Sequence, residues 1–162
     1  MFVRTLLFLL VVCLSFAARG QSSSHLNTPT PKDREVFNSC LEKAGVKLAP
    51  AVACIGAVFE ACQAEPKQQT SLGMRVCLSR ESELWDERLN AAYEKLMAAY
   101  PDAAKKQLRK AERTWITYRK QDCDVPVVLY NKGSFGPVAA MHCFNRATAL
   151  RAILLEQMIT PS

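Results

Sequence analysis

Residues 113–123 read RTWITYRKQDC, three helical turns that combine aromatic rings, cations and a cysteine. On an α-helix, Trp115, Arg119 and Cys123 follow one another at i, i+4 and i+8 and therefore share one face. A face of this composition suits a binding site, a catalytic site or a structural staple. The surrounding sequence favours the staple, with Cys123 as half of a disulfide. Arg119 is then expected to hold a carboxylate on a neighbouring helix, with Asp86 as first candidate.

Apolar side chains recur with helical period on both sides of this stretch, and no strand-like alternation of useful length occurs. Thr30 and Asp102 are expected to cap two of the helices, and Gly45 to end the first. The pattern predicts helices over about 31–45, 49–66, 72–100, 103–123 and 137–159, with a loop over 124–136. The fold class is therefore all-α: a disulfide-stapled helical bundle with two long antiparallel helices, a closing C-terminal helix and an N-terminal helical hairpin.

Residues 1–20 have the organisation of a secretory signal peptide: a basic start, an apolar run and small residues before the cut. Cleavage is expected between Ala17 and Gly20, and residues 21–30 form a flexible lead-in. A retained membrane anchor is the alternative. The mature protein is expected to be periplasmic or secreted, with no membrane span.

Cysteine use supports an oxidising compartment, because an even number of cysteines remains once Cys13 is removed with the signal. A zinc site is disfavoured because no CxxC pair occurs and His142 is the single histidine well inside the domain. Fifteen connectivities are open to six cysteines. Pairing by sequence neighbourhood predicts Cys40–Cys54, Cys62–Cys77 and Cys123–Cys143.

The chemistry needed by an enzyme is sparse. No GxSxG or phosphate-loop pattern occurs, and His142 stands beside a cysteine expected to be oxidised. We therefore predict a non-enzyme with no catalytic residue, metal or cofactor. An enzyme acting on cell-wall glycans would need carboxylates facing a cleft. The long helix offers Glu81, Glu83, Asp86 and Glu87, which are more typical of a solvated face.

A set of polar positions recurs at helical spacing across three helices. Asp86, Asn90 and Tyr93 stand at i, i+4 and i+7, and Thr148 with Arg151 forms a second pair on the last helix. We interpret these as a structural polar network that fixes helix register, with a ligand pocket as the alternative. Its members are Asp86, Asn90, Tyr93, Trp115, Arg119, Thr148 and Arg151.

The charge balance is mildly basic. Removing residues 1–20 takes away Arg4 and Arg19, which lowers the formal net charge from +6 to +4. This bias suits an anionic envelope polymer, but it is too weak and scattered to predict nucleic-acid binding. A basic face on the fourth helix comprises Lys105, Lys106, Arg109, Lys110 and Arg113.

Three segments together resemble a known family: CLSRESELWDERLNAAYEKL, LRKAERTWITYRKQDC and CFNRATALRAILL, within residues 77–155. They are similar to the lysozyme inhibitor LprI N-terminal domain family, a small exported bacterial helical module. Glu112 departs from the family's usual glutamine, and Lys120 from an acid that often follows the arginine. The matching residues are Cys77, Asp86, Leu89, Asn90, Tyr93, Leu108, Trp115, Tyr118, Arg119, Cys123, Cys143, Thr148 and Arg151.

The resemblance implies an LprI-like helical domain over 71–159, preceded by a helical hairpin extension over 31–66. It also implies an exported, non-enzymatic envelope binding protein whose partner is lysozyme or another protein. A loop pinned by a disulfide presents side chains at low entropic cost, so Tyr130, Lys132 and Phe135 are the candidate binding residues. The alternative is a basic protein that binds peptidoglycan or lipopolysaccharide.

Overall fold

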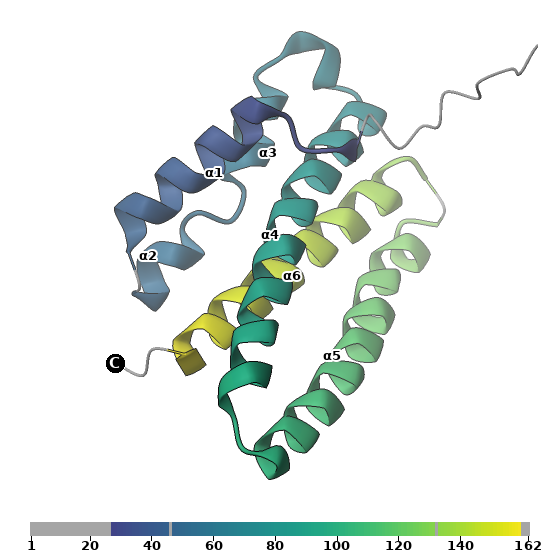
Figure 1. The fold of residues 1–162 in the computed structure, drawn as a ribbon. Coiled ribbons are helices and arrows are strands. Elements are labelled where there is room, and N and C mark those ends of the chain that lie inside the picture. The colour runs from purple at the N-terminus through teal and green to yellow at the C-terminus, as the bar shows by residue number, and fades with distance from the viewer. Residues whose placement is uncertain (1–26, 46, 132, 160–162) are drawn as a thin grey trace, which may run out of the picture.

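The computed structural model describes residues 27–45, 47–131 and 133–159 (Figure 1). The expected signal peptide, its cleavage site, most of the lead-in and Lys132 lie outside the described residues. Every regular element in the described part is helical, which confirms the all-α fold class. The elements are α1 (Pro31–Ala44), α2 (Leu48–Val52), α3 (Ala57–Gln63), the 3-10 turn η2 (Pro66–Gln68), α4 (Ser71–Ala99), α5 (Asp102–Leu129) and α6 (Phe135–Ile159).

Helix α1 begins and ends where local chemistry dictates. The Asp33 N–H donates to the Thr30 hydroxyl, and the Thr30 N–H donates back to the Asp33 carboxylate at 2.6 Å, which completes a capping box. Gly45 ends the helix at a φ of 62°, a value that glycine adopts without strain. The predicted cap and terminator of this helix are confirmed.

The prediction of one helix over 49–66 was wrong, because the segment splits into α2 and α3. Gly56 stands between them with a φ of 104°, which a continuous α-helix cannot accommodate. This residue is the N-cap of α3 and brings no side chain to satisfy the helix's free N–H groups. A side chain from another helix supplies that function, as described below.

Helix α5 differs from the prediction at both ends. Its N-cap is Pro101, so Asp102 is the first helical residue rather than the cap, and its charge instead lies in the first turn. The helix also continues through Pro126 to Leu129, where a loop was predicted. Pro126 removes one backbone donor, yet its carbonyl still accepts from the Tyr130 N–H at 3.0 Å. The predicted loop shrinks to a short turn.

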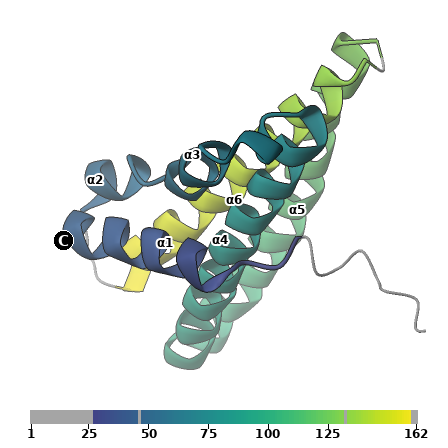
Figure 2. The ribbon, with the colours of Figure 1, turned by 90° about the horizontal axis from the view of Figure 1, so that it is seen from above.

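The helices form three layers. Helices α4 and α6 pack along each other in the middle, α5 packs on α6, and α1–α3 cover the opposite side (Figures 1 and 2). Helices α4 and α5 run antiparallel from the turn at Tyr100–Pro101, but they diverge and are joined mainly through α6. This divergence leaves facing sides of α4 and α5 that do not pack directly on each other.

The main core lies between the α1–α3 layer and the α4–α6 pair. Its centre is Trp85, fully buried, with the Phe37 ring edge-on at 4.7 Å between ring centroids. Val58, Leu96 and Ile153 complete the contact between layers. Helix α5 adds mainly Leu108 to this core, because it contacts α6 alone along most of its length.

Three disulfides link neighbouring segments, and the predicted pairing is confirmed. Cys40–Cys54 joins α1 to the turn after α2, Cys62–Cys77 joins α3 to α4, and Cys123–Cys143 joins α5 to α6, with Cα–Cα distances of 5.8, 5.7 and 5.4 Å. Such bridges stabilise mainly by restricting the unfolded chain. Within the described ranges, every helix is too short or too polar to cross a bilayer.

Candidate functional site

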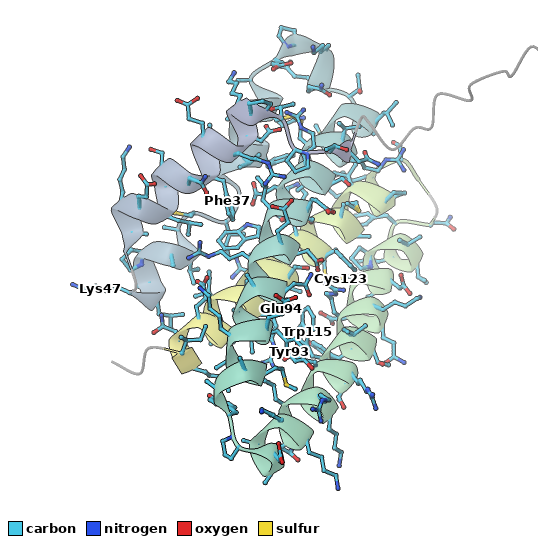
Figure 3. The ribbon with its side chains drawn as sticks, viewed as in Figure 1. Phe37, Lys47, Tyr93, Glu94, Trp115 and Cys123 are labelled. Carbon is cyan, nitrogen blue, oxygen red and sulfur yellow. A yellow bond between two sulfur atoms is a disulfide. The ribbon has the colours of Figure 1, made fainter. Side chains whose placement is uncertain are left out.

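A groove with a cavity volume of about 290 Å³ opens between α4 and α5. One wall is the face of α4 that repeats at i, i+3, i+4 and i+7, and the other is the inner face of α5. Figure 3 shows Tyr93 and Trp115 in the space between the two helices. The groove is lined by Asp86, Leu89, Asn90, Tyr93, Arg109, Glu112, Arg113, Trp115, Ile116 and Arg119.

Arg119 lies deep in this groove between two aromatic rings. Its guanidinium carbon is 4.4 Å from the centre of the Trp115 ring and 3.9 Å from that of Phe144. Its Nη1 donates to the Thr148 hydroxyl at 2.8 Å, and that hydroxyl donates to the Phe144 carbonyl. The groove therefore holds a cation by aromatic faces and a neutral hydroxyl.

The ion pair predicted between Arg119 and Asp86 is not formed. The Asp86 carboxylate instead accepts a hydrogen bond from the Asn90 amide at 2.9 Å, along its own helix. Burial lowers the pKa of Arg119, and the charge of Asp86 opposes that shift without contact. The divergence of α4 and α5 explains the difference, because helical spacing predicted a shared face but not the separation of the two walls.

A second cation at the back of the groove is fully paired. The Nε of Arg151, on α6, donates to the Glu112 carboxylate at 2.9 Å, and its Nη2 contacts the same oxygen. Glu112 is 8% exposed, so the pair is largely removed from water. Thr148 and Arg151 thus bind two different residues of α5 rather than acting on each other.

The residues of the polar network predicted from the sequence therefore lie in two groups, one across the groove and one on α6. Asp86, Asn90 and Tyr93 face Trp115 and Arg119 across the groove. The residues from α6 lie behind, attached to α5 by the bonds given above. Tyr118, which matches the family and lies three residues after Trp115, is 60% exposed, because α5 packs mainly on α6 and buries only a narrow stripe.

A different polar cluster centres on Glu81, for which the expectation of a solvated face was wrong. This carboxylate is completely buried and accepts from the backbone N–H groups of Gly56 and Phe59, both at 2.7 Å. It also accepts from the Trp85 indole at 3.2 Å and the Asn145 amide at 2.9 Å. Glu81 thus caps α3 from another helix, and substrate cannot reach it. Its place four residues after Cys77 and four before Trp85, on the face of the helix that carries these two residues, was the available signal.

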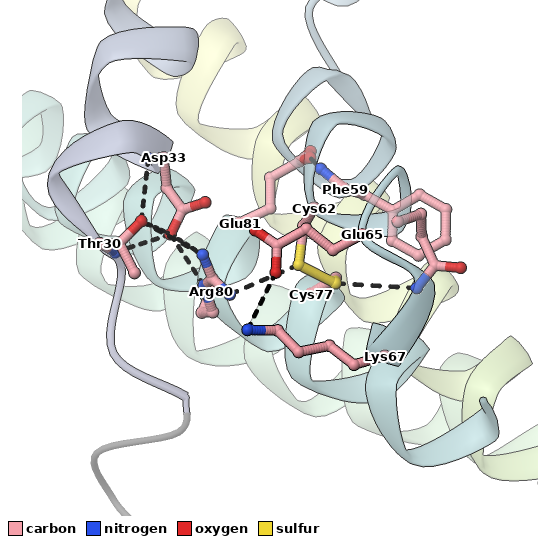
Figure 4. Close-up of polar contacts among 10 residues, drawn as sticks. Thr30, Asp33, Phe59, Cys62, Glu65, Lys67, Cys77, Arg80 and Glu81 are labelled. Atoms are coloured by element: carbon pink, nitrogen blue, oxygen red, sulfur yellow. Dashed lines mark hydrogen bonds and ion pairs between the residues drawn. A yellow bond between two sulfur atoms is a disulfide. The ribbon is translucent and has the colours of Figure 1, made fainter. Parts of the chain in front are cut away.

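Thr30, Asp33 and Arg80 form a neighbouring cluster (Figure 4). The Arg80 Nε donates to the Asp33 carboxylate at 2.8 Å, and both side chains are almost fully buried. Burial alone would raise the pKa of Asp33, but hydrogen bonds from Thr30 and then Arg80 outweigh it and hold the pKa below its ordinary value. The Thr-x-x-Asp spacing signalled the cap but not its partner Arg80.

The turn between α5 and α6 carries exposed apolar side chains. Tyr130 and Phe135 stack edge-to-face with 4.8 Å between ring centroids, and the Cys123–Cys143 bridge lies behind them. Of the predicted binding residues, these two are described and Lys132 is not. Sequence reasoning missed the helical neighbours that extend the surface. We call it the apolar tip: Val125, Val128, Leu129, Tyr130 and Phe135, all more than one third exposed.

The first half of α5 is basic, and two of its cations, Arg109 and Arg113, also line the groove. Lys106, Arg109, Lys110 and Arg113 surround a shallow depression of about 720 Å³ and are spaced at i, i+3, i+4 and i+7. No ion pair to an acid is formed by any of these four among the described residues, whereas Lys105 lies 3.9 Å from Asp102. This basic ridge matches most of the face predicted from the sequence.

Two further groups offer little chemistry. Asp122 lies close to Cys123 and Cys143, but both sulfurs are used in their disulfide and are not available as metal ligands. Burial lowers the pKa of His142, opposed by the charge of Glu81, and its ring packs edge-on to Phe59 at 4.7 Å. Neither group assembles a nucleophile with a base.

Comparison with known proteins places this chain in a family. The family model for lysozyme inhibitor LprI matches residues 62–155, more than half of the chain. An uncharacterized protein of Rhizobium meliloti (strain 1021) is 26% identical over 130 residues, which cover 68% of this chain and 94% of the relative. No solved structure gave a significant match. The matched segment contains the groove, the basic ridge and the apolar tip, and the chain belongs to the lysozyme inhibitor LprI family.

Proposed function

We propose that this protein is an exported, non-enzymatic binding protein of the bacterial envelope that inhibits a lysozyme-type enzyme. Membership of the LprI family supports the inhibitory activity. Three disulfides and the signal-like N-terminal sequence support export, because disulfides persist in oxidising compartments. Among the described residues, the burial of Glu81 and the oxidation of Cys143 remove two candidate catalytic groups, which supports binding rather than turnover.

The apolar tip is the observation that carries the proposal. Val128 and Leu129 are 79% and 71% exposed, beside the paired rings of Tyr130 and Phe135. A cluster of exposed apolar side chains on a small protein marks an interaction surface. The disulfide behind the tip restricts its backbone, so that less conformational entropy is lost on binding. A projecting apolar turn of this kind is suited to occluding the concave cleft of a glycan-cleaving enzyme.

Lysis of cell walls by several lysozyme types tests the proposal, with and without the oxidised mature protein. We expect saturable inhibition of at least one type. The double variant Val128→Ser/Leu129→Ser should weaken inhibition by about tenfold or more, because two anchors of the contact are lost. Leu72→Ser is the matched control and should inhibit like the parent, since Leu72 is 62% exposed at the start of α4 and is not one of the five tip residues.

One result would reject the proposed inhibition, and another would reject the apolar tip as the contact. The first is the absence of inhibition of every lysozyme type at a large molar excess of correctly oxidised protein. The second is a folded tip variant that inhibits as strongly as the parent, which would place the contact elsewhere on the molecule.

The basic ridge favours a second candidate function, binding of an anionic envelope polymer. Its four cations have no acidic partner in the described part of the chain and are free to meet a polyanion. Cosedimentation with insoluble peptidoglycan should then weaken sharply with added salt. Lys106→Gln/Lys110→Gln should lower the bound fraction at low salt. Binding that is indifferent to both salt and these substitutions would exclude the ridge.

A further inference from the structure

The groove between α4 and α5 has a cationic wall with unused binding capacity. Arg109 and Arg113 are exposed along its α5 side, and Arg119 lies deeper. Within the described residues, none of the three forms an ion pair with an acid. Two acids line the groove, but Glu112 is already bound by Arg151 and Asp86 lies on the opposite wall. The α5 wall therefore presents uncompensated positive charge.

Arg119 is only partly satisfied. Its Nε is buried and has no hydrogen-bond partner among the described residues, while one terminal nitrogen is held by Thr148. A desolvated charge without a counterion is costly, and an unpaired buried donor adds to that cost. Its charge therefore attracts an anionic group that enters the groove, while the exposed guanidinium groups of Arg109 and Arg113 offer forks of N–H donors that match the two oxygens of a carboxylate.

The rest of the groove suits an apolar body with an amide. Leu89 and Trp115 form its floor, with Tyr93 and Ile116 beside them. Across from the arginines, Asp86 can accept from a ligand N–H while Asn90 holds its other oxygen. The cavity of about 290 Å³ is at the small end of the range for ligand pockets, so it fits a residue or two rather than a folded domain.

From this arrangement we propose that the groove binds the C-terminal carboxylate end of a short peptide. The carboxylate lies against the arginines of α5, the last side chain lies on Trp115 and Leu89, and the amide N–H faces Asp86. The site is separate from the apolar tip, and the proposal does not rest on lysozyme inhibition.

Two-dimensional NMR of the oxidised, ¹⁵N-labelled protein tests this proposal through its two indole N–H signals. Trp115 lines the groove, and the fully buried Trp85 serves as an internal control. We expect N-acetyl-leucine to shift the Trp115 signal saturably, with a Kd of about 1 mM, and to leave Trp85 unmoved. N-acetyl-leucinamide, which differs only in lacking the charge, should bind at least about tenfold more weakly because the charge-assisted bonds are lost.

Single substitutions on α5 test whether this wall of the groove binds the carboxylate. Arg113→Gln should weaken binding of N-acetyl-leucine about fivefold or more, since it removes one charge-assisted contact. Lys110→Gln is the matched control, because Lys110 lies on the same helix but borders the outer depression and not the groove. Both positions are exposed, so the fold should be retained, and circular dichroism confirms this.

Three outcomes would overturn the proposal. One is the absence of a saturable Trp115 shift at concentrations well above the expected Kd. Another is an equal response to the carboxamide, which would show that the carboxylate is not recognised. The third is an equal response to inorganic phosphate, which would indicate general attraction of anions without any use of the apolar floor.

Discussion

Glu81 is a completely buried residue that accepts hydrogen bonds from several helices. One carboxylate satisfies two backbone N–H groups at the start of α3, the indole of Trp85 and the amide of Asn145. Buried donors that lose such an acceptor cost free energy individually, because water cannot replace it. The contacts come from α3, α4 and α6, so one side chain couples three helices.

We expect Glu81→Ala to lower the free energy of unfolding by about 3 kcal/mol or more, since several buried donors become unpaired. Urea denaturation followed by circular dichroism measures the change. Glu83→Ala, two residues along on the exposed side of the same helix, should change stability by less than about 0.5 kcal/mol. Similar stability of the two variants would contradict the capping role of Glu81.

Asp33 gives the fold a dependence on acid pH. Its pKa in the folded protein lies below the ordinary value of 3.8, despite burial, because Thr30 and Arg80 hydrogen-bond its charged form. The unfolded state therefore binds this proton more readily, and the stabilising contribution is present above about pH 4 and lost as pH falls through the folded pKa.

Asp33→Asn should thus be less stable than the parent by about 3 kcal/mol near neutral pH, because Arg80 loses its buried counterion. The gap should narrow as pH falls below about 4. Urea titrations of both proteins at a series of pH values measure it. A gap that stays constant into strong acid would show that Asp33 is not the titrating group.

Single residues also show how far sequence reasoning reaches. The shared face of Trp115, Arg119 and Cys123 follows from helical spacing, and the structure places all three toward the interior side of α5. The partner of Arg119 did not follow, because a cation can be held by rings and a hydroxyl as well as by an acid. Spacing identifies which residues share a face but not what lies opposite.

At the scale of elements, Gly73 allows a close contact between α4 and η2 that the sequence alone does not indicate. In the sequence it merely weakens the start of a long helix. In the structure, a Cβ added there would lie 2.4 Å from the backbone oxygen of Gln68, so α4 and η2 can approach only because this side chain is absent. The lower helix propensity of glycine is therefore tolerated at this position, because glycine permits the contact between α4 and η2.

The replacement Gly73→Ala should therefore destabilise the protein by about 2 kcal/mol, although alanine is favoured over glycine by about 1 kcal/mol in an ordinary helix. Thermal unfolding measures the sign. Ser71→Ala, at the first position of the same helix, is the control and should be nearly neutral. A stabilised Gly73→Ala protein would contradict the close approach.

Element boundaries were predicted where a capping side chain or a helix-breaking residue acts locally. Thr30 and Gly45 bound α1 as expected, since both act through adjacent backbone. A loop was predicted from residue 124, but α5 continues through Pro126 to Leu129, where α6 and a disulfide hold the helix. The helix predicted over 49–66 is interrupted at Gly56. The start of α3 at this point is capped by Glu81, which lies 25 residues further along the chain. Long-range contacts override local signals in both cases.

The whole molecule depends on α6, because both long helices pack against it more than against each other. The sequence predicted two antiparallel helices and a closing helix, and these are present. A ligand pocket was only the alternative interpretation of the predicted polar network, because the groove between α4 and α5 depends on the angle at which each helix meets α6. The residues that line it, however, were singled out by their spacing.

Two of the disulfides should stabilise the fold equally, but only one of them should affect how the apolar tip is presented. Cys40–Cys54 and Cys123–Cys143 are separated by 14 and 20 residues in sequence, so each should contribute about 3 kcal/mol by restricting the unfolded chain. Only the second encloses the apolar tip. Its loss frees the ends of α5 and α6, whereas loss of the first loosens α1 at the opposite side.

Paired Cys→Ser substitutions separate these contributions. Both Cys40→Ser/Cys54→Ser and Cys123→Ser/Cys143→Ser should lower the free energy of unfolding by about 3 kcal/mol in urea denaturation. In a lysozyme assay at a temperature where both remain folded, the first variant should inhibit like the parent. The second should lose about tenfold in potency, because a mobile tip must be ordered on binding. Equal inhibition by both folded variants would contradict a tip held for recognition by its disulfide and would direct the search for the contact to the rest of the surface.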